Sequence, residues 1–275
     1  MAASLPTPLP RRALITAVRR APAVLLYLDF DGTLVPIRSH PGRCQLSAAV
    51  GAALRELACD QRHPPIDLAV ISGRSLADLR QRLGPGMDAL GLAGNHGLEI
   101  ASHGQLWREP RAEALIPALQ AVAEHLQSAL QGWPGAWLEQ KGLSLSLHTR
   151  GLAAAQRQPL AQHLSPVLEQ ILEEGQFVLR RGRLVLEIRP AIAHTKATAV
   201  QWLEADAQRR GLWSPTAAEP PLRLYFGDDD TDEDVFLHWP GVVGIRVGPG
   251  DSNTAASYRL SGPAGVGHWL VDLAG

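Results

Sequence analysis

Four short stretches of the chain are apolar at almost every position, without the alternation expected of strands that have one face in water. They are AVLLYL before Asp29, IDLAVI before Ser72, LRLYF before Gly227 and VVGIRV before Gly248. Such continuous runs are typical of parallel strands covered on both faces. Between them, apolar residues recur at helical spacing, as over residues 46–57. The alternation of buried strands with helices predicts an α/β fold with a Rossmann-like parallel-sheet core.

The middle of the chain has a different pattern. The segment AWLEQKGLSLSLHTR alternates strictly, and FVLRRGRLVLEIRP predicts two strands about a turn at Arg181-Gly182. Because alternation implies a sheet with one wet face, we expect a separate, smaller α/β domain inserted into the larger one. The expected boundaries are a flexible N-terminal tail over 1–20, a core over 21–104 and 191–275, and the inserted domain over 105–190.

The composition excludes several function classes. The formal net charge is -1, with 19% charged and 45% hydrophobic residues, so no general attraction to nucleic acid or to an anionic membrane surface is expected. Cys44 and Cys59 are too few for a disulfide framework and are not spaced as a zinc site. With no signal-peptide pattern and no apolar stretch long enough to span a bilayer, we expect a cytoplasmic protein.

Polar residues follow three of the predicted buried strands. Asp29 and Asp31 follow the first strand, Ser72 and Arg74 follow the second, and the acidic segment GDDDTDED follows the third. In open parallel sheets the carboxyl ends of the strands form the ligand crevice. We therefore expect these residues, which lie far apart in the sequence, to converge at one edge of the sheet.

The acidic segment has both a structural and a functional interpretation. Thr231 and Asp234 fit a helix capping box, which explains the acids from 232 to 234 without any ligand. Capping does not explain Asp228 and Asp229 at the mouth of a buried strand. If Asp29 and Asp31 lie at the same mouth, a divalent cation is needed to hold the carboxylates together, and oxygen ligands favour Mg²⁺. Neither acidic stretch has the glycine and the terminal glutamate of a calcium-binding EF-hand loop.

The remaining polar residues at the strand ends favour phosphoryl transfer. Ser72, the Gly73 backbone and Arg74 lie at one strand end, and Lys196 falls in the first turn of a predicted helix, where free backbone N–H groups hold anions. Together with a metal, these are the parts that phosphoryl transfer requires. In this interpretation Asp29 attacks phosphorus, while Asp31 protonates the leaving oxygen and then activates water.

The motifs DFDGTL, ISGR, Lys196 and GDDDTDED, in this order, resemble those of the haloacid dehalogenase superfamily of aspartyl-phosphate phosphatases. More narrowly, GDDDTDEDVF with ISGR, NHG, LEQKG and LEIRP is similar to the trehalose-6-phosphate phosphatases, over about residues 27–258. The resemblance implies a haloacid dehalogenase-like core with a cap that determines substrate specificity, an Mg²⁺ cofactor and trehalose 6-phosphate as substrate. It also implies a functional link to a trehalose-6-phosphate synthase, and we expect a monomer.

Carried over to this sequence, the resemblance implies Asp29 as the nucleophile and Asp31 as the general acid and base. Mg²⁺ would be held by Asp29, the backbone carbonyl of Asp31 and Asp228, with Asp229 or Asp232 in support. The candidates for binding phosphate are Gly32, Ser72, Gly73 and Lys196. The candidates for binding substrate are Glu139, Lys141 and Glu187 in the cap, together with Arg74 and His96.

Several alternatives remain open at this point. By themselves, the alternating positions of Glu139, Lys141 and Glu187 favour salt-bridging surface residues, and only the resemblance favours sugar binding. His148 is expected to be a rim or structural residue, and His96 suits a substrate contact and a structural role equally. Arg74 is expected to organise the site through salt bridges rather than to touch phosphate. Two positions depart from the family pattern, since Lys196 is followed by Ala197 rather than glycine, and Asn95 replaces a common acidic residue. Another sugar phosphate, such as a glucosylglycerol or glucosylglycerate phosphate, or a non-catalytic sugar-phosphate sensor, are the competing functions.

Overall fold

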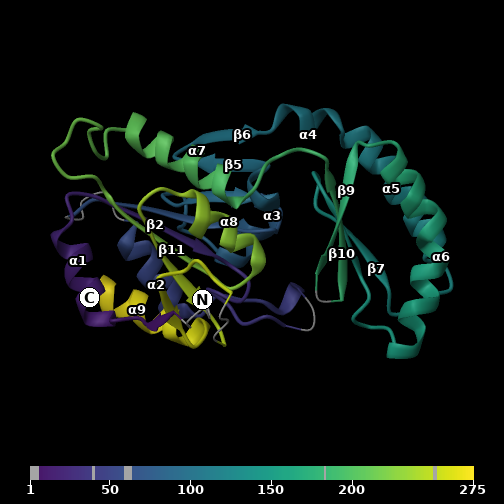
Figure 1. Ribbon diagram of the computed structural model, residues 1–275, viewed down its shortest axis with the longest axis horizontal. Coiled ribbons are helices and arrows are strands. Elements are labelled where there is room, and N and C mark those ends of the chain that lie inside the picture. Colours follow the sequence, from purple (N-terminus) through teal and green to yellow (C-terminus); the bar gives the residue numbers. More distant parts are fainter. Residues whose placement is uncertain (1–5, 39–40, 59–63, 183, 250–252) are drawn as a thin grey trace. The chain divides into compact units, whose positions relative to one another are not determined.

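A computed structural model describes residues 6–38, 41–58, 64–182, 184–249 and 253–275. The chain forms two compact units (Figure 1). The core unit comprises Met1–Trp107 and His194–Gly275, and the inserted unit comprises Arg108–Ala193. Cys44 is a buried free thiol, whereas Cys59 lies outside the described residues. Within the described part of the chain, no helix combines the length and the apolar composition needed to cross a membrane.

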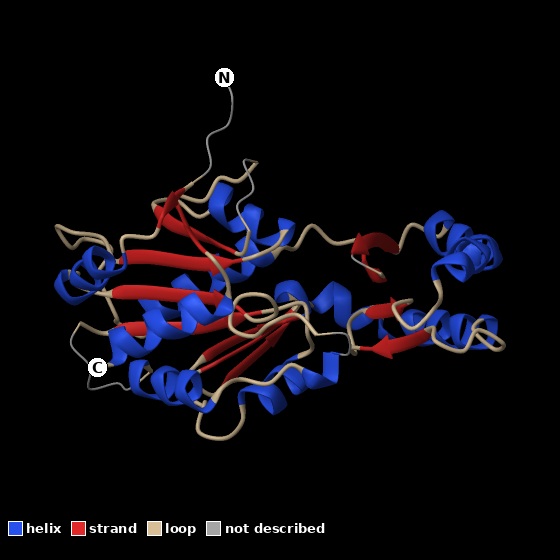
Figure 2. Ribbon diagram, turned by 90° about the horizontal axis from the view of Figure 1, so that it is seen from below, coloured by secondary structure: helices blue, strands red, loops and turns tan. Residues whose placement is uncertain are grey.

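The core unit is built on a nine-stranded sheet with helices on both faces (Figure 2). Every neighbouring pair from β1 to β4 is parallel, and β5 is antiparallel to β4. The strand order is β1 (Thr7–Pro8), β13 (Tyr258–Leu260), β12 (Val242–Val247), β11 (Leu222–Gly227), β2 (Val24–Asp29), β3 (Ile66–Ile71), β4 (Gly91–Gly94), β5 (Glu99–Ser102) and β6 (Gln105–Arg108). The helices are α1 (Arg11–Arg20), α2 (Ala48–Leu57), α3 (Leu76–Leu83), α7 (Lys196–Arg209), α8 (Asp230–His238) and α9 (Pro263–Ala274).

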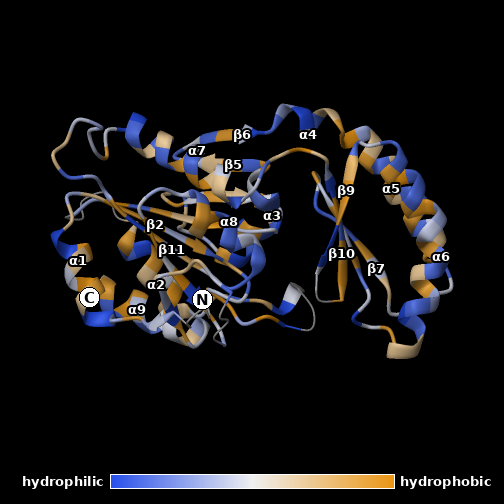
Figure 3. Cartoon of the chain, in the orientation of Figure 1, coloured by the Kyte–Doolittle hydropathy of each residue, from blue (hydrophilic) through white to orange (hydrophobic). Residues whose placement is uncertain are grey.

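Side chains of the central strand β2 contribute to two separate hydrophobic cores. Val24, Leu26 and Leu28 belong to one cluster, which also contains residues of α2, α3 and α9. Leu25 and Tyr27 belong to the other cluster, with residues of α7 and α8. Successive residues of the apolar run in β2 therefore point to two different covered faces of the sheet. The central strands are mostly hydrophobic (Figure 3). The predicted α/β class with a parallel-sheet core is confirmed.

Residues 11–20, which we expected to belong to a flexible tail, form helix α1. Leu14 and Val18, one helical turn apart, are buried in the first hydrophobic cluster, and α1 contacts α9. Arg11 adds an exposed ion pair with Asp272 at 2.9 Å. The tail prediction was wrong for this segment because two buried apolar residues at helical spacing are enough to anchor a short amphipathic helix when a partner helix is present.

The inserted unit contains a four-stranded antiparallel sheet in the order β7 (Trp137–Gln140), β8 (Leu145–His148), β10 (Val185–Pro190) and β9 (Phe177–Gly182). Its helices are α4 (Pro110–Ala114), α5 (Ile116–Ala129) and α6 (Ala154–Glu173). Leu147 and Ile188 pack into a hydrophobic cluster with residues of α5 and α6. On the opposite face, the register places Ser146 between Glu139 and Glu187. This is the predicted sheet with one polar face. We expected the inserted domain to cover residues 105–190, and the inserted unit covers Arg108–Ala193.

A buried ionic network joins strands β2, β3 and β5 to helix α7 and to Arg210, which follows it. Asp67 accepts hydrogen bonds from Tyr27 Oη at 2.8 Å and from Arg210, and Arg210 Nε also donates to Asp206 at 2.9 Å. Ser102 Oγ donates to Asp206 at 2.8 Å. Because both carboxylates are almost inaccessible to water, Arg210 supplies the positive charge that allows them to be buried.

Replacing Arg210 with glutamine leaves two buried carboxylates without their shared cation. We expect Arg210→Gln to lower the free energy of unfolding by about 2–4 kcal/mol, as judged by urea denaturation at neutral pH. Arg209→Gln is the matched control, because Arg209 also bonds Asp206, at 3.0 Å, from a largely exposed position. Its loss should cost under about 1 kcal/mol. Equal effects of the two substitutions would show that the buried carboxylates do not depend on Arg210.

The same network predicts a dependence on pH. Burial opposes ionisation of Asp206, but hydrogen bonds from Ser102, Arg210 and Arg209 hold its pKa below the ordinary value of 3.8. A depressed folded-state pKa contributes stability that is complete above the unfolded-state value and is lost as the pH falls through the folded-state value. The difference in unfolding free energy between wild type and Arg210→Gln should therefore shrink in acid below about pH 4. A constant difference down to the lowest accessible pH would rule this out.

Candidate active site

The core site lies at the carboxyl ends of three adjacent strands, β3, β2 and β11. Asp29 is the last residue of β2, Ser72 follows β3, and Asp228 follows β11. Asp31 lies in a tight turn after β2, where Gly32 N donates to Val35 O at 2.7 Å. The strand-end rule therefore brings these residues to one edge of the sheet, as we expected.

Lys196 is the centre of the site. It is the first residue of α7, which Thr195 caps, and its side chain is buried. Lys196 Nζ donates to Asp29 Oδ1 and to Asp232 Oδ1, at 2.8 Å in each case. A buried ammonium between two carboxylates is stable only as the charged form. Accordingly, although burial opposes protonation, Asp232 and Asp29 raise the pKa of Lys196 well above its ordinary value.

Asp232 is fully buried and accepts hydrogen bonds on both carboxylate oxygens. Oδ1 accepts from Lys196 and from Tyr225 Oη, at 2.8 and 2.7 Å. Oδ2 accepts from the backbone N–H groups of Asp228 and Asp229, at 2.9 and 3.0 Å. Asp232 therefore fixes both Lys196 and the loop that carries Asp228.

Helix α8 begins earlier than the predicted capping box implied. Asp229 is the N-cap and Asp232 occupies the third helical position, where we had placed the box on Thr231 and Asp234. Asp229 Oδ1 accepts from Thr231 N and Thr231 Oγ1, at 2.8 and 2.6 Å. The box was assigned two residues too late because a second acid at the right spacing precedes the one we used.

Two carboxylate oxygens of the site have no hydrogen-bond partner among the described residues. They are Asp29 Oδ2 and Asp228 Oδ1, and both are buried. Asp29, Asp228 and Asp232 each offer an oxygen within 4.8 Å of the others. Buried, unsatisfied carboxylate oxygens are costly, and oxygens grouped in this way are suitable ligands for a hard divalent cation.

The ionisation of the acids reflects this crowding of negative charge. Burial, followed by the charges of Asp232 and Asp229, raises the pKa of Asp228 to about 7. Burial also raises the pKa of Asp29 well above its ordinary value, against the opposing effect of Lys196. Asp229 is the exception: despite desolvation, Lys196 and Thr231 hold its pKa below the usual range. One lysine does not neutralise these carboxylates, so the site favours a further cation.

Glycine is required at two positions of this site. Gly32 has φ of 91°, and a Cβ atom there would lie 2.0 Å from Asp228 Oδ2. A Cβ atom at Gly227 would lie 2.2 Å from Asp232 Cγ. Both residues therefore let backbone and carboxylate approach more closely than any side chain allows.

The loop after β3 is fastened to the segment that contains Asn95 and His96. Asn95 N donates to Arg74 O at 2.7 Å, and His96 N donates to Ser72 O at 2.9 Å. Asn95 and His96 both adopt left-handed backbone conformations, with φ of 49° and 57°. The His96 ring covers Gly73, where a Cβ atom would lie 2.4 Å from Nε2. Asn95, which stands where the family pattern commonly has an acidic residue, donates a hydrogen bond from Nδ2 to Glu99 Oε1 at 2.7 Å.

Arg74 is bound by carboxylates rather than directed at open solvent. Its Nε and Nη2 donate to the two oxygens of Asp31, at 2.5 and 2.7 Å. Its Nη1 donates to Asp78 Oδ2, also at 2.5 Å. The sequence indicated salt bridges for Arg74 but provided no indication of Asp78 as a partner.

The polar face of the inserted unit carries the other candidate residues. Lys141 Nζ donates to Glu187 Oε1 at 3.0 Å, and Arg189 donates to Glu187 Oε2. Glu139 Oε2 lies 2.8 Å from His148 Nε2, and the His148 ring stacks on Trp137 with centroids 4.1 Å apart. These side chains form one charged group on the sheet. Trp137 was not among the predicted residues, because a single aromatic residue in an alternating strand carries no signal beyond packing.

The fold is shared with a solved haloacid dehalogenase-like hydrolase from Bacteroides thetaiotaomicron, with a TM-score of 0.57, 17% identity and coverage of 90% of this chain and 98% of that chain. A family model described as "Trehalose-phosphatase" matches residues 27–263. The chain belongs to the trehalose-phosphatase family.

Individual relatives and a solved structure resemble this chain over most of its length. A "trehalose-phosphate phosphatase" of Mycobacterium marinum is 34% identical over 92% of this chain and 62% of its own length. An "uncharacterized glycosyl hydrolase" of Mycobacterium tuberculosis is 38% identical over 93% of this chain, which corresponds to 18% of that protein. The solved C-terminal domain of C. albicans trehalose-6-phosphate phosphatase shares the fold, with a TM-score of 0.77, 24% identity and coverage of 100% and 99% of the two chains. The chain thus spans only part of the length of these curated relatives.

The close approach at Gly227 gives a prediction. Gly227→Ala should displace Asp232 and so loosen Lys196, lowering the free energy of unfolding by about 1–3 kcal/mol in denaturant titrations. Gly265→Ala is the control, because a Cβ atom there meets its nearest neighbour at an ordinary 3.5 Å within α9. That substitution should leave stability unchanged or raise it. A harmless Gly227→Ala would show that the contact with Asp232 is not restrictive.

Proposed function

We propose that the protein is a Mg²⁺-dependent phosphatase that hydrolyses trehalose 6-phosphate to trehalose and phosphate through an aspartyl-phosphate intermediate. The observation that carries the proposal is how the two carboxylate oxygens of Asp29 are bound. Lys196 holds one of its oxygens, and the other oxygen has no partner among the described residues, at the end of the central strand. Membership of the trehalose-phosphatase family supports the choice of substrate.

The residues at the strand ends fit a Mg²⁺ ion. Asp29, Asp228 and the backbone carbonyl of Asp31 would hold it, since Asp29 and Asp228 each have a buried oxygen without a partner in the described chain. Bound Mg²⁺ would neutralise charge on the phosphate oxygens. Asp232, whose oxygens already accept four hydrogen bonds, would support the site through Lys196 and the loop of Asp228.

The proposed reaction has two steps, phosphorylation of Asp29 and hydrolysis of the aspartyl phosphate. In the first, an oxygen of Asp29 forms a bond to phosphorus, the bond from phosphorus to the sugar oxygen breaks, and Asp31 gives its proton to that oxygen. In the second, Asp31 takes a proton from water as the water oxygen bonds to phosphorus and the Asp29–phosphorus bond breaks. Lys196, Ser72 and the backbone N–H groups of Gly32 and Gly73 would hold the phosphate oxygens in both steps.

The inserted unit would recognise the sugar. Glu139, Lys141 and Glu187 lie on one polar sheet face, and carboxylates held by neighbouring cations are suitable acceptors for sugar hydroxyl groups. His96 would contribute from the core unit. A different sugar phosphate would use the same core chemistry with other hydroxyl contacts. We also propose that the protein acts as a monomer on the product of a trehalose-6-phosphate synthase.

Phosphate release is the direct test. With Mg²⁺, wild type should release phosphate from trehalose 6-phosphate and much less from glucose 6-phosphate or sucrose 6-phosphate, while EDTA or Asp29→Asn should abolish release. Removing the nucleophile should reduce the rate by at least about 10⁴-fold. Metal-dependent release from a different sugar phosphate would preserve the chemistry and reject the substrate. Binding of trehalose 6-phosphate without release from any sugar phosphate would identify a sensor.

Glu187→Gln tests sugar recognition. Loss of a charged hydrogen-bond acceptor for the sugar should lower kcat/KM for trehalose 6-phosphate about 10–100-fold. Activity on p-nitrophenyl phosphate, which has no sugar, should change little. The control is Glu169→Gln in α6, whose carboxylate bonds only Ser165 among the contacts of the described residues and is exposed. Equal losses on both substrates would show that Glu187 maintains the fold of its unit instead.

A further inference from the structure

A chain of alternating charges runs from Asp31 into helix α3. Asp31 is bound by Arg74, Arg74 by Asp78, and Asp78 by Arg82, whose Nε and Nη2 lie 3.1 and 3.0 Å from Asp78 Oδ1. At the end of this series of ion pairs, Arg82 Nη1 donates a hydrogen bond to the carbonyl of Gly42 at 2.7 Å. The chain therefore joins the turn after β2 to the first two turns of α3.

The contact between Arg74 and Asp31 fixes an orientation as well as a charge. Two parallel N–H groups of the guanidinium meet the two oxygens of one carboxylate, so the planes of the two groups are held together. The Arg74 side chain is 8% exposed, and its Cζ lies 5.4 Å from the centre of the Phe30 ring. Its backbone is also bound, since Arg74 N donates to Ser72 Oγ at 3.2 Å.

Asp31 is much more exposed than the arginine that holds it. Its side chain is 33% exposed, it follows a strand in a turn, and no regular element limits its rotation. Proton transfer to the leaving oxygen and from water requires the carboxyl group to be aimed within hydrogen-bond reach of both. A half-buried aspartate in a turn can adopt more than one rotamer, so a fixed partner is needed to select one.

We propose that Arg74 is a positioning residue that holds Asp31 in the orientation for proton transfer, and that Asp78 and Arg82 in turn hold Arg74. This inference rests on the proposed function, because it assigns Asp31 the role of acid and base. It gives Arg74 no contact with substrate. Asp78 and Arg82 lie on α3 and act only through Arg74, so these two residues support the orientation of Asp31 from a distance.

The choice of leaving group separates positioning from binding. p-Nitrophenolate is weakly basic and leaves without a proton, whereas a sugar oxygen requires one. In Arg74→Gln, a misaimed Asp31 should lower kcat on trehalose 6-phosphate about 100-fold with little change in KM. On p-nitrophenyl phosphate, phosphorylation of Asp29 should survive while hydrolysis slows. Rapid-quench measurements should then show a burst of one p-nitrophenolate per chain that wild type lacks.

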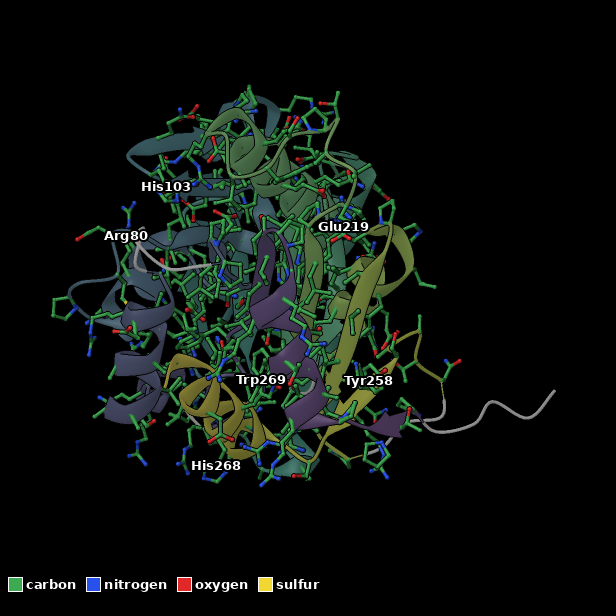
Figure 4. The ribbon with its side chains drawn as sticks, turned by 90° about the vertical axis from the view of Figure 1, so that its left-hand side faces the viewer. Arg80, His103, Glu219, Tyr258, His268 and Trp269 are labelled. Atoms are coloured by element: carbon green, nitrogen blue, oxygen red, sulfur yellow. The ribbon has the colours of Figure 1, made fainter. Side chains whose placement is uncertain are left out.

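Three further variants distinguish the possible explanations. Arg74→Lys keeps the charge but cannot bond both oxygens in parallel, so it should behave like Arg74→Gln. Asp78→Asn should show the same pattern more weakly, with kcat about three- to tenfold lower. Arg80→Gln is the matched control, because Arg80 is exposed on the same helix and should leave both substrates unaffected (Figure 4).

Several outcomes would overturn the proposal. A rise in KM with unchanged kcat would make Arg74 a substrate-binding residue, and full activity of Arg74→Lys would show that charge alone suffices. If Arg74→Gln does not fold, Asp78→Asn decides: unchanged kinetics would refute the proposal. The activity of wild type distinguishes failure of the proposed function from failure of the positioning role. If it releases phosphate only from p-nitrophenyl phosphate, the proposed substrate fails, while the burst in the Arg74 variant still tests the positioning role.

Discussion

The buried contact between Lys196 and the two carboxylates of Asp29 and Asp232 is the interaction on which the rest of the site depends. A lysine that is 2% exposed needs nearby negative charge to remain protonated, and these two residues supply it at 2.8 Å each. Asp29 comes from the central strand, Asp232 from α8 and Lys196 from the start of α7. The triad therefore ties three separate segments of the chain to one point at the end of the sheet.

Buried ion pairs of this kind contribute little net stability, because desolvation offsets most of the Coulomb attraction. The core unit gains its stability from the two hydrophobic clusters on either side of β2. The charged groups at the strand ends are instead positioned at a cost, which shows in the raised pKa values of Asp29 and Asp228. Groups held in this way at the ends of parallel strands are those expected of a reaction centre.

The sequence was informative wherever a local pattern determines a structure. Continuous apolar runs predicted the buried strands, strict alternation predicted the polar sheet of the inserted unit, and the strand-end rule brought Asp29, Ser72 and Asp228 together. The network around the site could not be predicted in this way. Tyr225 lies inside an apolar run and has the pattern of a core residue, yet its hydroxyl group bonds Asp232. Helix α1 was missed because its anchoring depends on α9, which lies at the other end of the chain.

Arg74 shows most clearly where local pattern stops and tertiary structure decides. The sequence places an arginine after a serine at a strand end, which suits a phosphate contact and a salt bridge equally well. The fold brings Asp31, 43 positions away in the sequence, against two guanidinium nitrogens of Arg74, while the nearby Asp78 binds the third. All three guanidinium nitrogens of Arg74 donate to Asp31 or Asp78, so the geometry of its planar group is already set by these two carboxylates. In the proposed mechanism, Lys196 and the backbone N–H groups would therefore bind the phosphate, and Arg74 would position Asp31.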